Sequence, residues 1–178
     1  MEKYLINKHI ALEGTEQEHI REATYSNCRK YRYGLKIVWD KSKPIMVYCC
    51  LNPSTATEMQ NDPTIERLER RARQKDFGGM WMLNIFAYRA TEPKDMKSQE
   101  NPVGTLNDDY ISYVVSETGA KKIHCGWGNH GLHLDRQKQI TELFNQLGVS
   151  GLAIKINKNG TPAHPLYQSY KKDFDLEI

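Results

Sequence analysis

Residues 45–51 read IMVYCCL, and residues 52–55, which follow at once, read NPST. The first stretch is apolar throughout and has the length of a buried strand. The second stretch places the small polar side chains of Asn52 and Ser54 beside Pro53, directly after that strand. Open α/β sheets bind ligands at the carboxyl ends of their strands. This junction therefore predicts both the fold class and the position of a binding site.

Strand and helix patterns alternate along the rest of the chain. Residues 31–39 alternate as a strand does, and the turn at 40–44 predicts a hairpin with residues 45–51. Helices are expected from the cap Asp62 to just before Gly78, over 107–117 and over 133–147, and further strands over 80–87, 122–127 and 152–156. The order predicts an α/β protein of three layers (α/β/α) around a central, mostly parallel sheet, preceded by an N-terminal β-hairpin.

Length and composition indicate one globular domain over residues 1–178, with residues 1–30 as an irregular or weakly stranded N-terminal arm. Hydrophobic residues make up 39% and charged residues 26% of the chain, which excludes a disordered protein. No apolar run approaches the roughly 20 residues that span a membrane, and the first residues lack a signal-peptide core. We therefore expect a cytoplasmic protein that makes no membrane contact.

The net charge and the cysteine pattern exclude few classes of function. The net charge of +3 permits contact with nucleic acid without requiring it. The basic stretch 67–75 also contains Glu69, and its pattern is typical of a solvated helix face with ion pairs. Cys49, Cys50 and Cys125 lie in apolar strands and are expected to be buried and reduced, and no C-x-x-C pair indicates a zinc ribbon. The motifs of P-loop, dinucleotide-binding and α/β-hydrolase proteins are absent.

Four predicted strands or turns deliver polar side chains that could act on a ligand: Asn52, Asn84, residues 126–130 and His164. Asn52 can orient a water or accept from a ligand N–H, and Asn84 suits the edge of a nucleobase. His164 can donate to an oxygen that gains negative charge. Each also has a structural explanation, as a turn cap, a backbone partner inside the sheet or a surface histidine. Their repeated position at strand ends favours function.

The same segments resemble the motifs of the uracil-DNA glycosylase superfamily. CLNPS at 50–54 resembles its first motif in the asparagine form, and MLN at 82–84 resembles its base-reading strand. GWG at 126–128 resembles its Trp-Gly strand end, and HPL at 164–166 resembles its final histidine motif. The resemblance implies a glycosylase-like α/β/α fold without a cofactor.

The resemblance also implies roles for individual residues. His164 would stabilise the departing base anion, Asn52 would position the attacking water, and Asn84 would hold the base edge. Tyr48 or Phe86 would stack on the base. On DNA, the target nucleotide would be flipped out of the duplex.

A closer resemblance, from Arg32 to Tyr167, is to a bacterial and phage family of uncharacterised domains. It rests on five motifs: LNPSTA, DPT, NxFAxRAT, WGxHG and HPLY. From both resemblances, the expected substrate-binding residues are Pro53, Ser54, Asn84, Phe86, Arg89, Trp127, Asn129 and His130. Arg89 would pair with a phosphate or, alternatively, with Asp62 or Glu92. His130 and His133 have a spacing that suits a metal, but no third ligand is evident and no metal is expected.

Three functions remain open on the sequence. The first is an enzyme that hydrolyses an N-glycosidic bond in DNA or in a nucleotide, and a modified base is one candidate substrate. The second is a binding module that recognises a nucleotide or nucleic acid without cleaving it. The third is a nucleotide-modifying transferase. The expected partner is a nucleotide or DNA in all three, and the sequence does not determine the oligomeric state.

Overall fold

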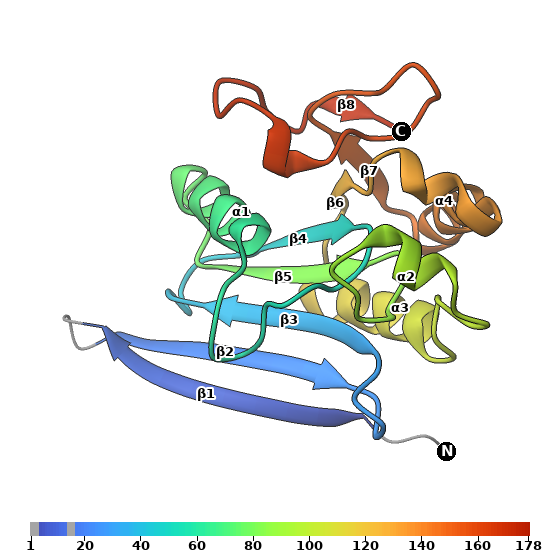
Figure 1. Ribbon diagram of the computed structural model, residues 1–178. Coiled ribbons are helices and arrows are strands. Elements are labelled where there is room, and N and C mark those ends of the chain that lie inside the picture. Colours follow the sequence, from blue (N-terminus) through green and yellow to red (C-terminus); the bar gives the residue numbers. More distant parts are fainter. Residues whose placement is uncertain (1–3, 14–16) are drawn as a thin grey trace.

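The computed structural model describes residues 4–13 and 17–178. Within that part of the chain, eight strands form one mixed sheet in the order β1-β2-β3-β5-β4-β6-β7-β8 (Figure 1). The strands are β1 (Leu5–Glu13), β2 (Gln17–Tyr25), β3 (Arg32–Val38), β4 (Ile45–Cys50), β5 (Gly79–Asn84), β6 (Lys122–Gly126), β7 (Ser150–Ala153) and β8 (Leu176–Glu177). Only the neighbours β5–β4, β4–β6 and β6–β7 are parallel, and the other pairs are antiparallel. The expectation of a mostly parallel sheet is therefore wrong, although the protein is α/β and its central strands are parallel.

Helices lie against both faces of the central strands (Figure 1). The described helices are α1 (Pro63–Gln74), α2 (Pro93–Lys97), α3 (Asn107–Thr118) and α4 (Arg136–Leu147), with 3-10 turns η1 (Asn129–Asp135) and η2 (Pro165–Tyr167). Helix α1 packs on one face, whereas α3 and α4 pack on the other. No helix in the described ranges combines the length and apolar character needed to cross a membrane.

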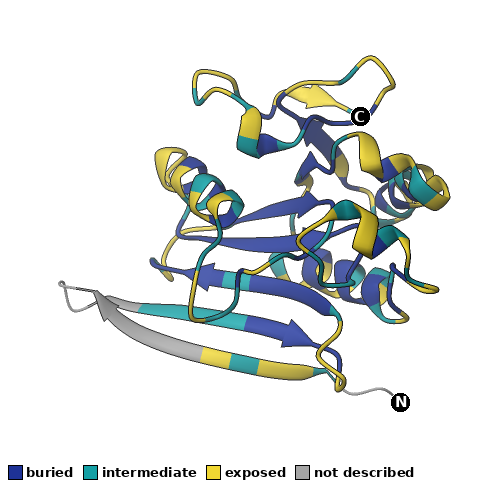
Figure 2. Cartoon of the chain, in the orientation of Figure 1, coloured by how far each residue is buried: buried dark blue, intermediate teal, exposed yellow. Residues whose placement is uncertain are grey.

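Strand β4 is buried on both sides, as its continuous apolar sequence predicts. Met46, Tyr48 and Cys50 join the cluster under α1, and Val47 and Cys49 join the cluster under α3 and α4. Figure 2 shows the resulting band of buried residues through the central strands. The three strand cysteines are buried and free, as expected.

The expected hairpin between residues 31–39 and 45–51 does not form, because β5 lies between β3 and β4. The turn instead passes around the start of β5, where Trp39 N and Asp40 N both donate to Gly78 O. A side chain at Gly78 would stand 2.0 Å from Asp40 O, so this close passage requires glycine. The short turn after β3 favours a hairpin with β4, but β3 pairs with β5 instead, a strand that lies farther along the chain.

Of the two alternatives that the sequence left open for the N-terminal arm, strands form, and each of the two is nine residues long rather than short. β1 and β2 pair antiparallel with each other, and β2 continues the sheet from β3 (Figure 1). A strand near a sheet edge does not need an apolar sequence on both faces. Both strands are therefore polar, and their sequences do not clearly predict a strand.

The helix starts test the capping predictions. Asp62 caps α1 by accepting from Ile65 N at 2.9 Å, and Pro63 occupies the first helical position, as the sequence predicts. The helix expected from residue 133 begins instead at Arg136, because Leu134 and Asp135 adopt left-handed backbone angles. The strand expected over 80–87 ends at Asn84, and the strand expected over 152–156 covers Ser150–Ala153.

The basic stretch of α1 is only partly the solvated ion-paired face that its sequence predicts. Arg73 does pair with Glu69, at 2.8 Å. Arg67 and Arg71, however, donate to backbone carbonyls of the C-terminal segment, on Pro165, Gln168, Ser169 and Lys172. These side chains fasten the segment that follows His164 to the helix.

Candidate functional site

A pocket with a volume of about 680 Å³ opens at the carboxyl ends of β4 and β6. After β4, the next strand in the chain, β5, lies on one side of β4 in the sheet. The strand after that, β6, lies on the other side of β4, so the strand order reverses between β4 and β6. Ligands in open α/β sheets bind at such a switch point, and the volume suits a small organic ligand. The pocket brings together six of the predicted site residues: Asn52, Ser54, Trp127, Asn129, His130 and His164.

Asn52 directly follows β4 and is held by two hydrogen bonds from its amide nitrogen. Nδ2 donates to Ala90 O at 2.7 Å and to Pro53 O at 3.0 Å. Both amide hydrogens are thereby used, and Oδ1 accepts no hydrogen bond within residues 4–13 and 17–178. Asn52 therefore offers the pocket an acceptor, which suits a water molecule or a ligand N–H.

His164 reaches the pocket because the backbone of β6 lets its turn pack closely. A side chain at Gly126 would lie 2.4 Å from Pro165 Cδ and 3.3 Å from Ala163 O. Gly128 N, two residues on, donates to Pro162 O at 2.8 Å. The Trp-Gly strand end thus packs against the histidine turn, which Arg67 also holds through Pro165 O.

The surroundings of His164 determine its protonation state and which ring nitrogen carries the proton. Leu166 N donates to His164 Nδ1 at 3.4 Å, which leaves the ring proton of the neutral form on Nε2. Burial lowers the pKa of His164 from its ordinary value, and the charge of Asp62 only partly opposes that shift. The side chain is therefore a neutral N–H donor at pH 7.

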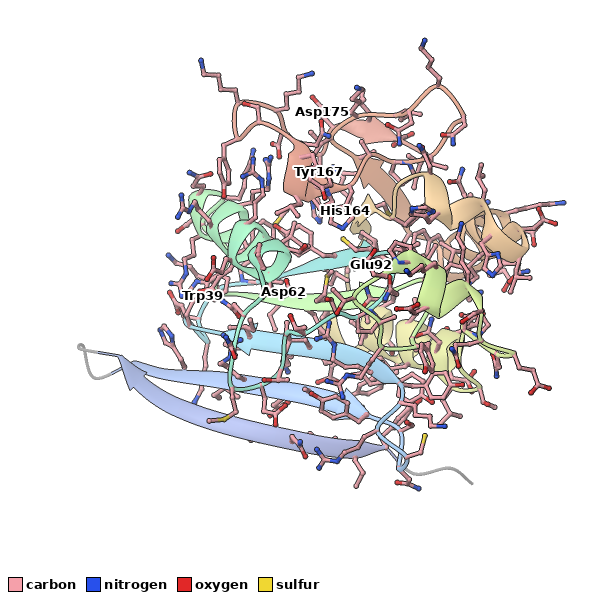
Figure 3. All side chains as sticks on the ribbon, viewed as in Figure 1. Trp39, Asp62, Glu92, His164, Tyr167 and Asp175 are labelled. Carbon is pink, nitrogen blue, oxygen red and sulfur yellow. The ribbon has the colours of Figure 1, made fainter. Side chains whose placement is uncertain are left out.

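Asp62 is a pocket residue that the sequence marks only as a helix cap. Its carboxylate accepts from Ile65 N, and it also lines the pocket, close enough to His164 to act on its pKa. Asp62, Glu92, His164 and Tyr167 all line the pocket, and Figure 3 labels these four side chains. The sequence could have indicated Asp62 as a pocket residue. Its cap position places it at the end of the loop that follows β4, where the pocket was expected.

The turn after β6 presents an amide donor. Asn129 Oδ1 accepts from Asn157 Nδ2 and from Thr161 Oγ1, both at 3.1 Å. The amide nitrogen of Asn129, which is exposed and lines the pocket, is left to donate. Asn129 as donor and Asn52 as acceptor are complementary to the mixed hydrogen-bonding edge of a nucleobase.

The remaining predicted residues lie outside the pocket lining. Phe86 is fully buried and packs near His133, and Pro53 is buried beside Ala90. Asn84 is 1% exposed, and its side-chain nitrogen and oxygen have no partner among the described residues. Tyr48, the other suggested stacking residue, is enclosed under α1 with its hydroxyl bonded to Leu68 O.

Arg89 lines a second, shallower depression that shares Ser54 and Thr55 with the main pocket. Its guanidinium donates to Arg29 O and lies over the Tyr25 ring. Neither expected ion pair of Arg89, with Asp62 or with Glu92, forms in the described part of the chain.

A family model described as "Protein of unknown function (DUF1643)" matches residues 32–166. The chain belongs to the DUF1643 family. The match covers almost the same residues, Arg32 to Tyr167, over which the sequence resembles a family of uncharacterised domains, and it confirms that a domain of unknown function spans them. No curated protein and no solved structure matches the DUF1643 chain significantly.

The DUF1643 pocket contains histidines and carboxylates, but they do not form a cation site. Among the residues that the structure describes, no three His, Cys, Asp or Glu side chains cluster as metal ligands do. Asn52, Asp62, Asn129 and His164 present hydrogen-bonding groups and one carboxylate to the pocket from three loops.

We expect the DUF1643 domain to lose stability as the pH falls below about 6.5. Burial lowers the pKa of both His124 and His164 below that ordinary value, so the unfolded chain takes up protons first. The contribution of these two histidines to stability is then fully present above about pH 6.5 and is lost as the pH falls through the folded-state pKa values. Urea unfolding at a series of pH values measures this slope. The double variant His124→Gln/His164→Gln should have a flatter slope, and an unchanged slope would contradict the assignment.

Proposed function

We propose that this protein binds a nucleobase in the pocket at β4 and β6 and hydrolyses the N-glycosidic bond that joins it to its sugar. The observation that carries the proposal is the neutral N–H donor of His164 in the same pocket as the carboxylate of Asp62. A leaving group that becomes an anion needs such a donor, and an attacking water needs such an acceptor.

The reaction follows from those two groups. The C1′–N bond breaks, the electron pair leaves with the base, and the sugar acquires oxocarbenium character. His164 Nε2–H donates to a base oxygen that gains negative charge, and this bond is strongest in the transition state. A water held by Asn52 Oδ1 and the Asp62 carboxylate attacks C1′ and gives up a proton to Asp62. The proton that Asp62 accepts is returned to the departed base anion through solvent, so the products are a neutral free base and a sugar with a hydroxyl group at C1′.

Base recognition would use Asn129 in place of Asn84. Asn129 supplies a donor, whereas the side chain of Asn84 is buried and does not line the pocket. The role that the superfamily resemblance gives to Asn84 thus passes to the turn after β6. Tyr167, which is 81% exposed and lines the pocket, is the aromatic available to stack on a bound base.

The arrangement of the central strands supports the same reading. Parallel strands β5, β4, β6 and β7 with helices on both faces are the layers that a uracil-DNA glycosylase-like α/β/α domain would need. Relative to such a core, strands β1, β2 and β3 would be an antiparallel extension. We propose this fold relationship together with the activity, since fold by itself does not assign chemistry.

The test is mass spectrometry of small molecules released by the purified protein. The substrates are a panel of deoxynucleotides and DNA containing uracil, hypoxanthine or hydroxymethyluracil. We expect a free base from the wild type and none from His164→Ala or Asn52→Ala. Asn145→Ala, which alters an exposed asparagine on α4, is the matched control and should retain activity.

The other outcomes separate the alternatives. A nucleotide that stays unchanged and bound to the protein would indicate a binding module that recognises the nucleotide without hydrolysing it. A nucleotide that returns with a new covalent group would indicate a transferase. Release that survives in both pocket variants would contradict the assigned site.

A further inference from the structure

Arg32 is a buried arginine with unusually few partners. Arg136 and Arg32 are each 1% exposed and Arg71 is 5% exposed. Arg136 donates to Asp108 and two other acceptors, and Arg71 donates to three carbonyls. Arg32 donates only through Nη1, to Ala56 O, and its Nε has no partner within the described residues.

The charge of Arg32 also lacks an ion-pair partner within the described residues. Burial lowers the pKa of Arg32 to about 10, so the guanidinium is still a cation at pH 7. Asp62 and Glu58 act on it electrostatically, but neither forms an ion pair with it in the described part of the chain. A buried charge without an ion-pair partner destabilises a fold, and an unsatisfied buried polar group calls for an explanation such as a bound ion.

Arg32 lines the main pocket, in which Asp62, Asn52 and His164 also lie. The positive charge of Arg89 is close enough to lower the pKa of Arg32, and the loop carrying Ser54 and Thr55 borders both the pocket and the depression that Arg89 lines. Guanidinium forks and hydroxyl groups are the donors that phosphate oxygens accept from. The pocket thus has a cationic part beside its base-recognising part.

We propose that Arg32 forms an anion subsite for the terminal phosphate of the ligand, so that the substrate is a free mononucleotide rather than duplex DNA. The assignment of a nucleotide rests on the proposed function, whereas the anion subsite rests on the burial and unsatisfied donors of Arg32 and on its place in the pocket. A terminal phosphate can enter the pocket with its base. A phosphodiester within a duplex could reach a 1% exposed guanidinium only if the flanking strand followed it inside.

The first test uses inorganic phosphate as the probe and follows Tm at constant ionic strength. At ten times its Kd, phosphate should raise the Tm of the wild type by about 3 °C. Arg32→Gln should have a ligand-free Tm no lower than the wild type, because a buried unpaired charge is removed, and should not respond to phosphate. Arg136→Gln should show the opposite pattern, a lower Tm with the phosphate response retained.

Two results would overturn the subsite: no response in the wild type, or an undiminished response in Arg32→Gln. If Arg32→Gln does not fold, titration calorimetry on the wild type decides, with deoxynucleosides and their 5′-monophosphates compared in pairs. Each bound nucleotide should bind at least about tenfold more tightly than its nucleoside. Equal affinities, or base release from DNA but from no nucleotide, would overturn the mononucleotide assignment and leave N-glycosidic hydrolysis standing.

Discussion

Asp62→Asn is expected to slow base release by about 10²–10⁴-fold while leaving the protein folded. The carboxylate is the acceptor for the proton of the attacking water, and an amide oxygen is too weak a base to replace it. Asparagine caps a helix about as well as aspartate, so the hydrogen bond from Ile65 N is kept. Rates of base release, with urea unfolding as the measure of stability, test both halves of this result.

Two further variants separate chemistry from capping at this position. Asp62→Ala should lose activity to the same extent and also about 1 kcal/mol of stability, since alanine cannot cap α1. Glu92→Gln is the matched control, because Glu92 also lines the pocket but makes no side-chain bond to its own helix. An active Asp62→Asn, or a Glu92→Gln that is equally impaired, would assign the proton acceptor elsewhere.

Gly126→Ala is expected to have two effects at once. It should destabilise the protein by about 1–3 kcal/mol, and it should lower the rate of base release. The new Cβ would stand 2.4 Å from Pro165 Cδ, a ring atom that cannot rotate away. Relief requires movement of the turn that carries His164, and an ångström-scale displacement of a catalytic group lowers rates strongly. Urea unfolding and initial rates on the same preparation measure the two effects.

A double-mutant cycle tests the cause. Pro165→Ala removes the ring atoms that the new Cβ would meet, so the pair Gly126→Ala/Pro165→Ala should be more stable than the sum of the single changes predicts. A coupling of about 1 kcal/mol is expected for residues in direct contact. Strict additivity would show that the strain lies elsewhere.

The local features of the fold could be predicted where short-range physics controls them. The cap Asp62 and the proline at the start of α1 are fixed by backbone hydrogen bonding within one turn. β4 is apolar at every position because both its faces are covered. The end of α4 at Gly148, with its left-handed backbone, follows from the same kind of local rule.

Strand pairing could not be predicted in the same way. The sequence around residues 40–44 is compatible with a hairpin, and only the insertion of β5 between β3 and β4 excludes it. The strands β1 and β2 are polar enough to resemble an irregular arm. Pairing energy depends on which neighbour is available, and that is a property of the assembled sheet.

The sequence by itself determined that this is an α/β protein of the DUF1643 family, with polar residues at the carboxyl ends of its strands. Only the tertiary structure decided which of those residues share a pocket. It placed Asn52, Asn129 and His164 there with Asp62 and Arg32, and left Asn84 and Phe86 outside. Residues far apart in the chain meet only through the strand order, and whether a side chain faces the pocket or the core depends on its register in the sheet.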